Sequence, residues 1–223
     1  MQHHAHQIEA VYFDVGGVLI DETRIYTEWA RWFGVSPFDF FGLLGAVIER
    51  GQHHLRAFKA VRPGFDLAVE EAARVAAGCP NVVQAQDLFP DVAGCLQGLL
   101  ATGLRVGVAG NQPTSTEAVL KAAGLPAEVI ASSESWGVEK PAPAFFTRLA
   151  AEAGLPPSAI AYVGDRLDND VAPAAAAGML PVFLERGPWA RIHRTWPGIQ
   201  QAAVHIATLA DLPAALAPFA RHR

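Results

Sequence analysis

Strand-like and helix-like segments alternate along the chain from residue 90 onward, and this alternation constrains the fold more than any other feature. A glycine follows each predicted helix, as is common just past a helix end. Alternating strands and helices are typical of parallel βαβ units, so we expect an α/β fold with a doubly wound, Rossmann-like parallel sheet. The predicted strands span residues 9–13, 104–109, 127–131, 159–163 and 180–184, with an edge strand at 205–209, and the predicted helices span 91–101, 113–123, 143–153 and 171–177.

Residues 20–87 interrupt this alternation with helical patterns alone. Apolar residues recur on one helix face between positions 25 and 33. Ser36 and Pro37 have the residue types of an N-cap and a first helical position, and residues 66–77 form a third helical pattern. The sequence therefore predicts an α/β core over residues 1–19 and 88–223, with a small all-helical cap over residues 20–87.

Composition excludes several function classes. The net charge of the 223 residues is −5 and no Lys/Arg-rich run occurs, so we expect no binding to nucleic acid or to an anionic membrane surface. No apolar run reaches the length of a membrane span, and the polar start does not resemble a signal peptide. Cys79 and Cys95 suggest neither a zinc site nor a disulfide framework, which favours a cytoplasmic protein. The residues His3, His4 and His6 could bind a metal, although a polar tail is the simpler interpretation.

Polar residues stand at the ends of three predicted strands. Asp14 follows the first strand and precedes two glycines, Asn111 follows Gly110, and Asp165 follows Gly164. Ligands of doubly wound sheets bind beyond the carboxyl ends of the strands, near the point where the strand order reverses. We therefore expect these residues to meet in one site, although aspartate and asparagine also occur there as ordinary turn residues.

These residue types suit phosphate chemistry. The Asp14 carboxylate can attack phosphorus, as carboxylates do in some ATPases. Residues 165–170 contain three acids, and their oxygens suit Mg²⁺, with Asp165 as the better direct ligand and Asp170 as a supporting residue or helix-capping acid. Asp168 is interpreted as a plain cap or surface acid. Lys140, in a stiff proline-containing loop, can neutralise a phosphate.

Four segments resemble, in order, the motifs of the haloacid-dehalogenase superfamily of phosphatases: FDVGGVL, VGVAGN, VEKPAPAFF and YVGDRLDNDVAPAAAAGM. The resemblance implies that Asp14 is the nucleophile and that the helical insert is a cap that covers the substrate. It also implies roles for further residues: Mg²⁺ held by Asp14, the Gly16 carbonyl and Asp165 with support from Asp170; Lys140 steadying phosphate and nucleophile; and Gly110 and Asn111 lining the phosphate pocket.

Two positions depart from the family pattern. Gly16 stands where the phosphatases usually carry a second aspartate as general acid/base, and Gly110 stands where Ser or Thr is usual. The sequence thus predicts a Mg²⁺-dependent phosphatase of a small phosphorylated metabolite, slowed by the absence of an acid/base that is typically worth about 10²–10⁴-fold. One alternative is a weakened relative that binds a phosphorylated ligand or a protein partner, and another is a metal-independent dehalogenase, which would not need the acid at position 165.

The insert is expected to move as a lid and to set substrate preference. Its polar and aromatic candidates for facing the substrate are Arg24, Tyr26, Trp29, Arg50, His53, His54, Arg56 and Lys59. Arg50, His53 and Arg56 are the ones whose substitution should change preference. The substrate itself and the oligomeric state are not assigned from sequence.

Overall fold

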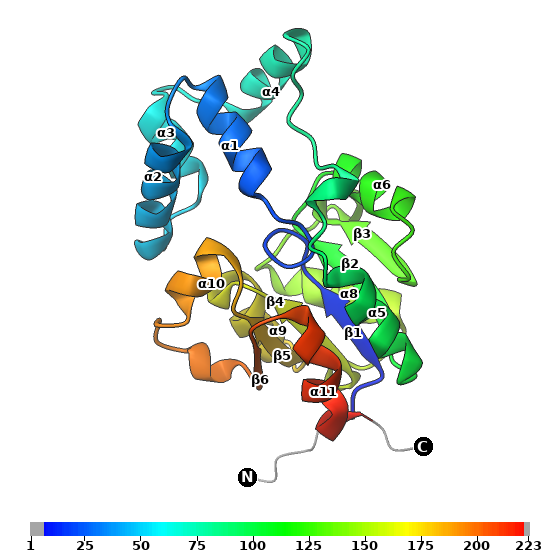
Figure 1. The fold of residues 1–223 in the computed structure, drawn as a ribbon. Helices are drawn as coiled ribbons and strands as arrows, with labels where there is room; N and C mark the ends of the chain where they lie inside the picture. Colours follow the sequence, from blue (N-terminus) through cyan, green and yellow to red (C-terminus); the bar gives the residue numbers. More distant parts are fainter. Residues whose placement is uncertain (1–6, 221–223) are drawn as a thin grey trace. The chain divides into compact units, whose positions relative to one another are not determined.

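The computed structural model describes residues 7–220 and divides the chain into two compact units (Figure 1). One unit comprises Met1–Asp21 and Leu88–Arg223, and the other comprises Glu22–Asp87. The histidines at positions 3, 4 and 6 lie outside the described residues.

The first unit contains a six-stranded sheet with the order β3-β2-β1-β4-β5-β6. Its pairings are all parallel, which confirms the doubly wound α/β class. The central strand β1 lies between β2 and β4, so the strand order reverses beside it, and the chain just after β1 meets the ligand-binding edge of the sheet. The strands are β1 Ala10–Phe13, β2 Arg105–Gly110, β3 Val129–Ser132, β4 Ile160–Gly164, β5 Leu180–Leu184 and β6 Val204–Ile206.

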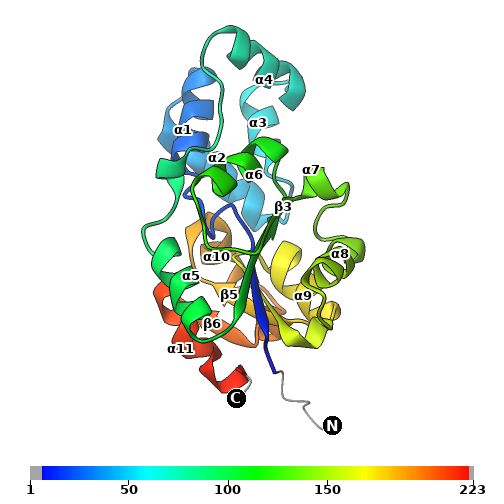
Figure 2. The ribbon, with the colours of Figure 1, turned by 90° about the vertical axis from the view of Figure 1, so that its right-hand side faces the viewer.

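Helices cover both faces of this sheet, with α5 and α11 on one face and α8 and α9 on the other (Figure 2). Coverage on both sides explains why β1, β4 and β5 are buried along their whole length. An aromatic cluster packs between α8 and the sheet, where the Phe146 and Tyr162 rings meet edge to face at 5.4 Å. The helices are α5 Val92–Ala101, α6 Thr114–Ala122, α7 Ser133–Trp136, α8 Pro143–Ala153, α9 Ala172–Ala176, α10 Gly187–His193 and α11 Leu212–Leu216.

The structure differs from the sequence prediction at several boundaries. The third strand begins two residues later than predicted, and the predicted helix over 171–177 is preceded by a wide π-helical turn, Leu167–Val171. Helices α7 and α10 were not predicted, because both are short and lack an apolar period of their own. Ser132 explains α7, since it ends β3 and also caps the helix by accepting a hydrogen bond from the Ser135 N–H.

The second unit is helical throughout. Ser36 caps α2 by accepting from the Asp39 N–H at 3.1 Å, as the sequence predicts, whereas α3 lacks such a side-chain cap and was missed. Aromatic rings fill the centre, with Phe58 lying 5.1 Å from Phe40 and 5.0 Å from Phe65 between ring centroids. The helices are α1 Thr23–Trp32, α2 Pro37–Glu49, α3 Leu55–Val61 and α4 Leu67–Ala76.

Three of the insert's candidate substrate-facing residues have structural partners within their own unit. The Tyr26 and Trp29 side chains are buried among the other aromatic rings. The Arg24 Nε donates to the Asp87 carboxylate at 2.8 Å, and its Nη1 donates to Glu28 at 2.7 Å. The Arg24 guanidinium is therefore engaged in ion pairs within the second unit rather than available to bind a substrate.

Between residues 7 and 220, no single helix is long and apolar enough to cross a bilayer, although the sharply bent pair α1 and α2 passes on length and composition together.

Candidate active site

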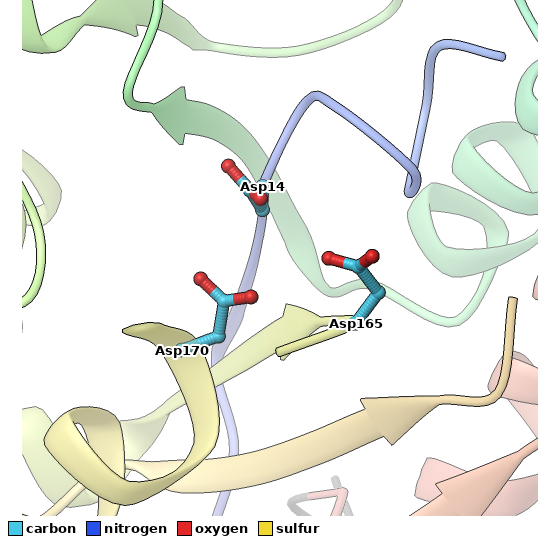
Figure 3. A group of neighbouring side chains, drawn as sticks. All are labelled: Asp14, Asp165 and Asp170. Atoms are coloured by element: carbon cyan, nitrogen blue, oxygen red, sulfur yellow. The ribbon is translucent and has the colours of Figure 1, made fainter. Parts of the chain in front are cut away.

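Three carboxylates converge at the carboxyl edge of the sheet (Figure 3). Asp14 follows β1, Asp165 follows the neighbouring strand β4, and Asp170 lies in the π-helical turn that comes next. One oxygen from each carboxylate lies within 4.8 Å of the other two, and all three residues are buried. Adjacent parallel strands therefore bring together acids that are far apart in sequence.

Lys140 joins two of these carboxylates. Its Nζ lies 2.7 Å from the Asp14 Oδ1 and 2.6 Å from the Asp170 Oδ1, and the side chain is fully buried. Burial by itself would lower the pKa of Lys140, but the carboxylates of Asp14 and Asp170 raise it well above its ordinary value. The ammonium ion is thus a permanent positive charge inside the site.

Two aromatic rings lie near this ammonium. The Nζ is 5.3 Å from the centre of the Tyr162 ring and 6.0 Å from that of Phe145. The Tyr162 hydroxyl donates to the Ala109 carbonyl at 2.8 Å, so the phenol is fixed in the sheet rather than free to titrate. Burial raises the pKa of Tyr162 further. Sequence analysis missed Tyr162 because an aromatic residue in a buried strand gives no signal beyond the core pattern.

The Asn111 side chain is hydrogen-bonded to the backbone of Lys140. Its Nδ2 donates to the Lys140 carbonyl and its Oδ1 accepts from the Lys140 N–H, both at 2.8 Å. The prediction placed this amide on the phosphate pocket, but these two bonds direct it to the backbone that carries Lys140. Asn111 thereby connects the end of β2 to the position of the buried ammonium.

Asp170 is enclosed more completely than the other two acids. Its Oδ1 accepts from Lys140 and its Oδ2 accepts from the Arg166 N–H at 3.0 Å. Burial raises the pKa of Asp170, the Lys140 charge opposes this rise, and the Asp14 carboxylate adds to it. A β-carbon on Gly164 would overlap the Asp170 side chain, so this glycine makes room for it.

Two other glycines allow the remaining acids to approach the backbone. Gly17 has a left-handed φ of 69°, and a β-carbon there would lie 2.6 Å from the Asp165 Oδ2. A β-carbon on Gly110 would overlap the Asp14 Oδ1 and would lie 3.2 Å from the Val15 N. The absence of a side chain at Gly110 is therefore part of how Asp14 is placed.

His193, on α10, contacts the π-helical turn Leu167–Val171 that contains Asp170. Its Nδ1 accepts from the Leu167 N–H at 3.1 Å, and its ring lies on that of Trp196 at 3.9 Å. Burial lowers the pKa of His193 from 6.5 to about 4, which keeps the ring neutral and able to accept this bond. Sequence analysis missed His193 because α10 itself was not predicted. Asp168 lies in the same turn and pairs with Arg166 at 2.8 Å, in line with its interpretation as a surface acid.

The fold is a doubly wound sheet, and its site has an aspartate after β1, a buried lysine and two further acids after β4. These features define an α/β hydrolase of the class that the four sequence motifs predicted. Residues 8–178 match the model of the haloacid dehalogenase-like hydrolase family, and the chain belongs to this family. A relative from Methanopyrus kandleri, named glyceraldehyde 3-phosphate phosphatase, is 31% identical over 202 residues, which cover 82% of this chain and 86% of the relative.

Solved structures share the fold. A HAD phosphatase from Thermococcus onnurineus superposes with a TM-score of 0.60 at 23% identity, covering 95% of this chain and 99% of that one. The L-2-haloacid dehalogenase from Xanthobacter autotrophicus, solved with chloropropionic acid covalently bound, gives a TM-score of 0.67 at 16% identity, covering 93% and 98%. Because one fold serves both chemistries, activity has to be argued from the site.

Proposed function

We propose that the protein is a Mg²⁺-dependent phosphatase that hydrolyses a small phosphorylated metabolite through an aspartyl-phosphate on Asp14. The observation that carries this proposal is the contact of Lys140 with Asp14 beside two further acids. The named activity of the Methanopyrus kandleri relative supports a phosphorylated small molecule as the substrate.

The contact between Asp14 and Lys140 suggests a separate role for each residue in the reaction. The Asp14 Oδ1 is paired with Lys140, so we assign the attack on phosphorus to Oδ2. A P–O bond forms to Oδ2 while the bond to the substrate's alcohol oxygen breaks, and water then releases phosphate and restores the carboxylate. The Lys140 ammonium lies beside the nucleophile, where it can attract the phosphoryl oxygens.

The donor set fits a magnesium ion. It consists of oxygen atoms only, which is the preference of Mg²⁺ in proteins. Asp14, Asp165 and the Gly16 carbonyl would hold the ion, and Asp170 would support them, since both of its oxygens already accept hydrogen bonds from protein groups. A bound Mg²⁺ would neutralise charge on the phosphoryl group and the acids.

Gly16 leaves no carboxyl group at the family's usual acid/base position. In our proposal a water molecule acts as the general acid/base, so the departing alkoxide receives no proton from a fixed side chain. Rates should then fall steeply as the leaving alcohol becomes less acidic. An aryl phosphate should be cleaved much faster than an alkyl phosphate.

The direct test is hydrolysis of p-nitrophenyl phosphate and of a panel of phosphorylated metabolites, with Mg²⁺ and with EDTA. Asp14→Asn should abolish turnover, because the nearly isosteric amide is a poor nucleophile. Wild-type rates in EDTA would contradict the metal requirement, and wild-type rates in Asp14→Asn would contradict the nucleophile.

One observation favours a second candidate function. Gly16 would suit a metal-independent dehalogenase, in which no acid/base is needed at this position. Asp165 argues against it, because a buried carboxylate with no cation to hold would only repel the nucleophile. Release of chloride from 2-chloropropionate in EDTA, with no activity on phosphate esters, would establish the dehalogenase instead.

A further inference from the structure

Arg186 follows β5, and its side chain touches two separate segments of the first unit. The Nη1 donates to the Val18 carbonyl at 3.2 Å, and the Nη2 forms an ion pair with the Asp91 carboxylate. The guanidinium carbon lies 4.2 Å from the centre of the Phe89 ring. Only 14% of the Arg186 side chain is exposed, so these contacts account for most of its surroundings.

The contacted segments are the two places where the chain crosses between units. The chain leaves the first unit after Asp21 and returns at Leu88. Within the first unit the two segments are also joined to each other, through the bridge between Ile20 and Leu88 and through the Phe89 N–H, which donates to the Leu19 carbonyl at 2.9 Å. Arg186 ties this joined pair to the carboxyl end of the sheet.

The outgoing segment is continuous with the loop that follows Asp14. The Leu19 and Ile20 N–H groups donate to the Val15 carbonyl at 2.8 and 2.9 Å. The Gly17 N–H donates to the Ile20 carbonyl at 2.9 Å, which closes the loop on itself. A group that holds the Val18 carbonyl therefore restrains the peptide of Gly16 two residues before it.

The Asp91 carboxylate contacts both Arg186 and a distant backbone N–H group. Its Oδ2 accepts from the Leu209 N–H at 3.0 Å and from Arg186, whereas its Oδ1 is buried and accepts no hydrogen bond from the described residues. Asp91 therefore joins the Arg186 guanidinium to the backbone of Leu209 within the first unit.

We propose that Arg186 is a positioning residue of the active site, which fixes the loop over residues 15–20 and with it the Gly16 carbonyl. Asp91 sets the direction of Arg186, and Phe89 supports the guanidinium plane. The proposal rests on the proposed function only in taking the Gly16 carbonyl as a magnesium ligand. The restraint on the loop itself is independent of that assignment.

Arg186→Ala, Arg186→Lys and Arg191→Ala would be compared with the wild type. Arg191 is the matched control, because it also pairs with a neighbouring acid, Glu185 at 2.8 Å, but its side chain is 62% exposed. The readouts are hydrogen exchange in residues 15–20 and 88–92, Mg²⁺ affinity by calorimetry, and steady-state hydrolysis of p-nitrophenyl phosphate.

Arg186→Ala should speed exchange in both segments and weaken Mg²⁺ binding by about 10–100-fold, the usual effect of removing a residue behind a metal ligand. Arg186→Lys should fall between Arg186→Ala and the wild type, since one ammonium can pair with Asp91 but cannot reproduce the planar fork. Arg191→Ala should match the wild type in all three readouts.

The outcomes separate this proposal from the proposed function. Unchanged exchange in residues 15–20 together with unchanged Mg²⁺ affinity in Arg186→Ala would overturn the positioning role, even if the variant melted at a lower temperature. Faster exchange and weaker Mg²⁺ binding in a protein that hydrolyses no phosphate ester would keep the positioning role and reject the phosphatase. Should Arg186→Ala not fold, Asp91→Asn removes the ion pair at nearly constant shape and must give the same changes.

Discussion

Gly110, which ends β2, lies so close to Asp14, which follows the adjacent strand β1, that a β-carbon on Gly110 would overlap the Asp14 Oδ1. Because Ser or Thr is usual in the family at the position of Gly110, the sequence alone favours Thr there as an additional donor to the phosphate. The geometry predicts the opposite. Gly110→Thr should displace the Asp14 carboxylate, and a misplacement of about 1 Å can lower kcat by about 10²-fold.

Gly110→Ala should show most of this loss, because the β-carbon alone creates the overlap. Steady-state hydrolysis with saturating Mg²⁺ measures it. Gly94→Ala in α5 is the control, since a β-carbon there meets nothing within 4 Å. A gain in kcat for Gly110→Thr would show that Asp14 moves aside without penalty and that the missing hydroxyl limits the enzyme.

Lys140→Met should destabilise the protein and abolish turnover. The substitution leaves the buried carboxylates of Asp14 and Asp170 without the ammonium that both contact. Breaking a buried ion pair by removing one partner typically costs about 3–5 kcal/mol in the free energy of unfolding. Urea denaturation measures this, and Lys121→Met is the control, because Lys121 pairs with Glu117 at the surface and should matter by less than about 1 kcal/mol. Equal losses for the two variants would contradict a special role for the buried charge.

Asp165→Ala should weaken Mg²⁺ binding strongly, whereas Asp168→Ala should not. The two acids belong to the same short stretch, but only Asp165 lies in the buried cluster with Asp14. Asp168 has a 42% exposed side chain that pairs with Arg166. Calorimetric titration with Mg²⁺ compares them at equal change of charge. Similar affinities for both variants would mean that general acidity, rather than the cluster, attracts the cation.

Sequence patterns predicted the fold well because parallel strands buried on both faces and glycine-terminated helices leave strong local signals. The same patterns predicted that residues at the ends of β1, β2 and β4 would meet, since that follows from parallel topology alone. They could not show that the amide of Asn111 faces the Lys140 backbone. That contact links residues 29 positions apart through two loops.

The supporting residues were missed for a related reason. His193 and Arg186 act through single contacts with distant backbone groups, the Leu167 N–H and the Val18 carbonyl. Neither contact leaves a periodic or compositional trace in the sequence. A histidine in an unpredicted short helix and an arginine after a strand look the same whether they face solvent or a loop beside the active site.

His193 should make the protein less stable as the pH falls from about 6.5 toward 4. Burial lowers the pKa of His193 to about 4 in the folded protein, against 6.5 when exposed, so the unfolded chain binds the extra proton first. The free energy of unfolding therefore rises with pH across this window, and His193 contributes up to roughly 3 kcal/mol of the change.

Urea denaturation of the wild type and of His193→Asn at pH 7.5 and pH 4.5 isolates this contribution. Asn can still accept from the Leu167 N–H but does not titrate, so its stability should fall less between the two pH values, whatever its stability at pH 7.5. Identical pH-dependent losses in the two proteins would assign the effect to other groups.

Gly16→Asp should raise the rate at which the protein hydrolyses phosphate esters. The new carboxylic acid would protonate the departing alcohol oxygen and then activate the water that cleaves the aspartyl-phosphate, a role worth about 10²–10⁴-fold. The backbone angle at position 16 favours the change, because among the described residues the left-handed φ of this loop falls on Gly17 and not on Gly16. The gain should be larger for alkyl phosphates than for p-nitrophenyl phosphate, whose leaving group needs no proton.

Steady-state rates on both substrate types, with trapping of the phosphoenzyme, measure this difference. Gly17→Asp is the control that should be inactive, since a side chain there would meet Asp165. A Gly16→Asp protein that folds and binds Mg²⁺ but forms no phosphoenzyme on any substrate would favour the ligand-binding alternative. If Gly16→Asp instead slows an already fast wild type, another group must supply the proton.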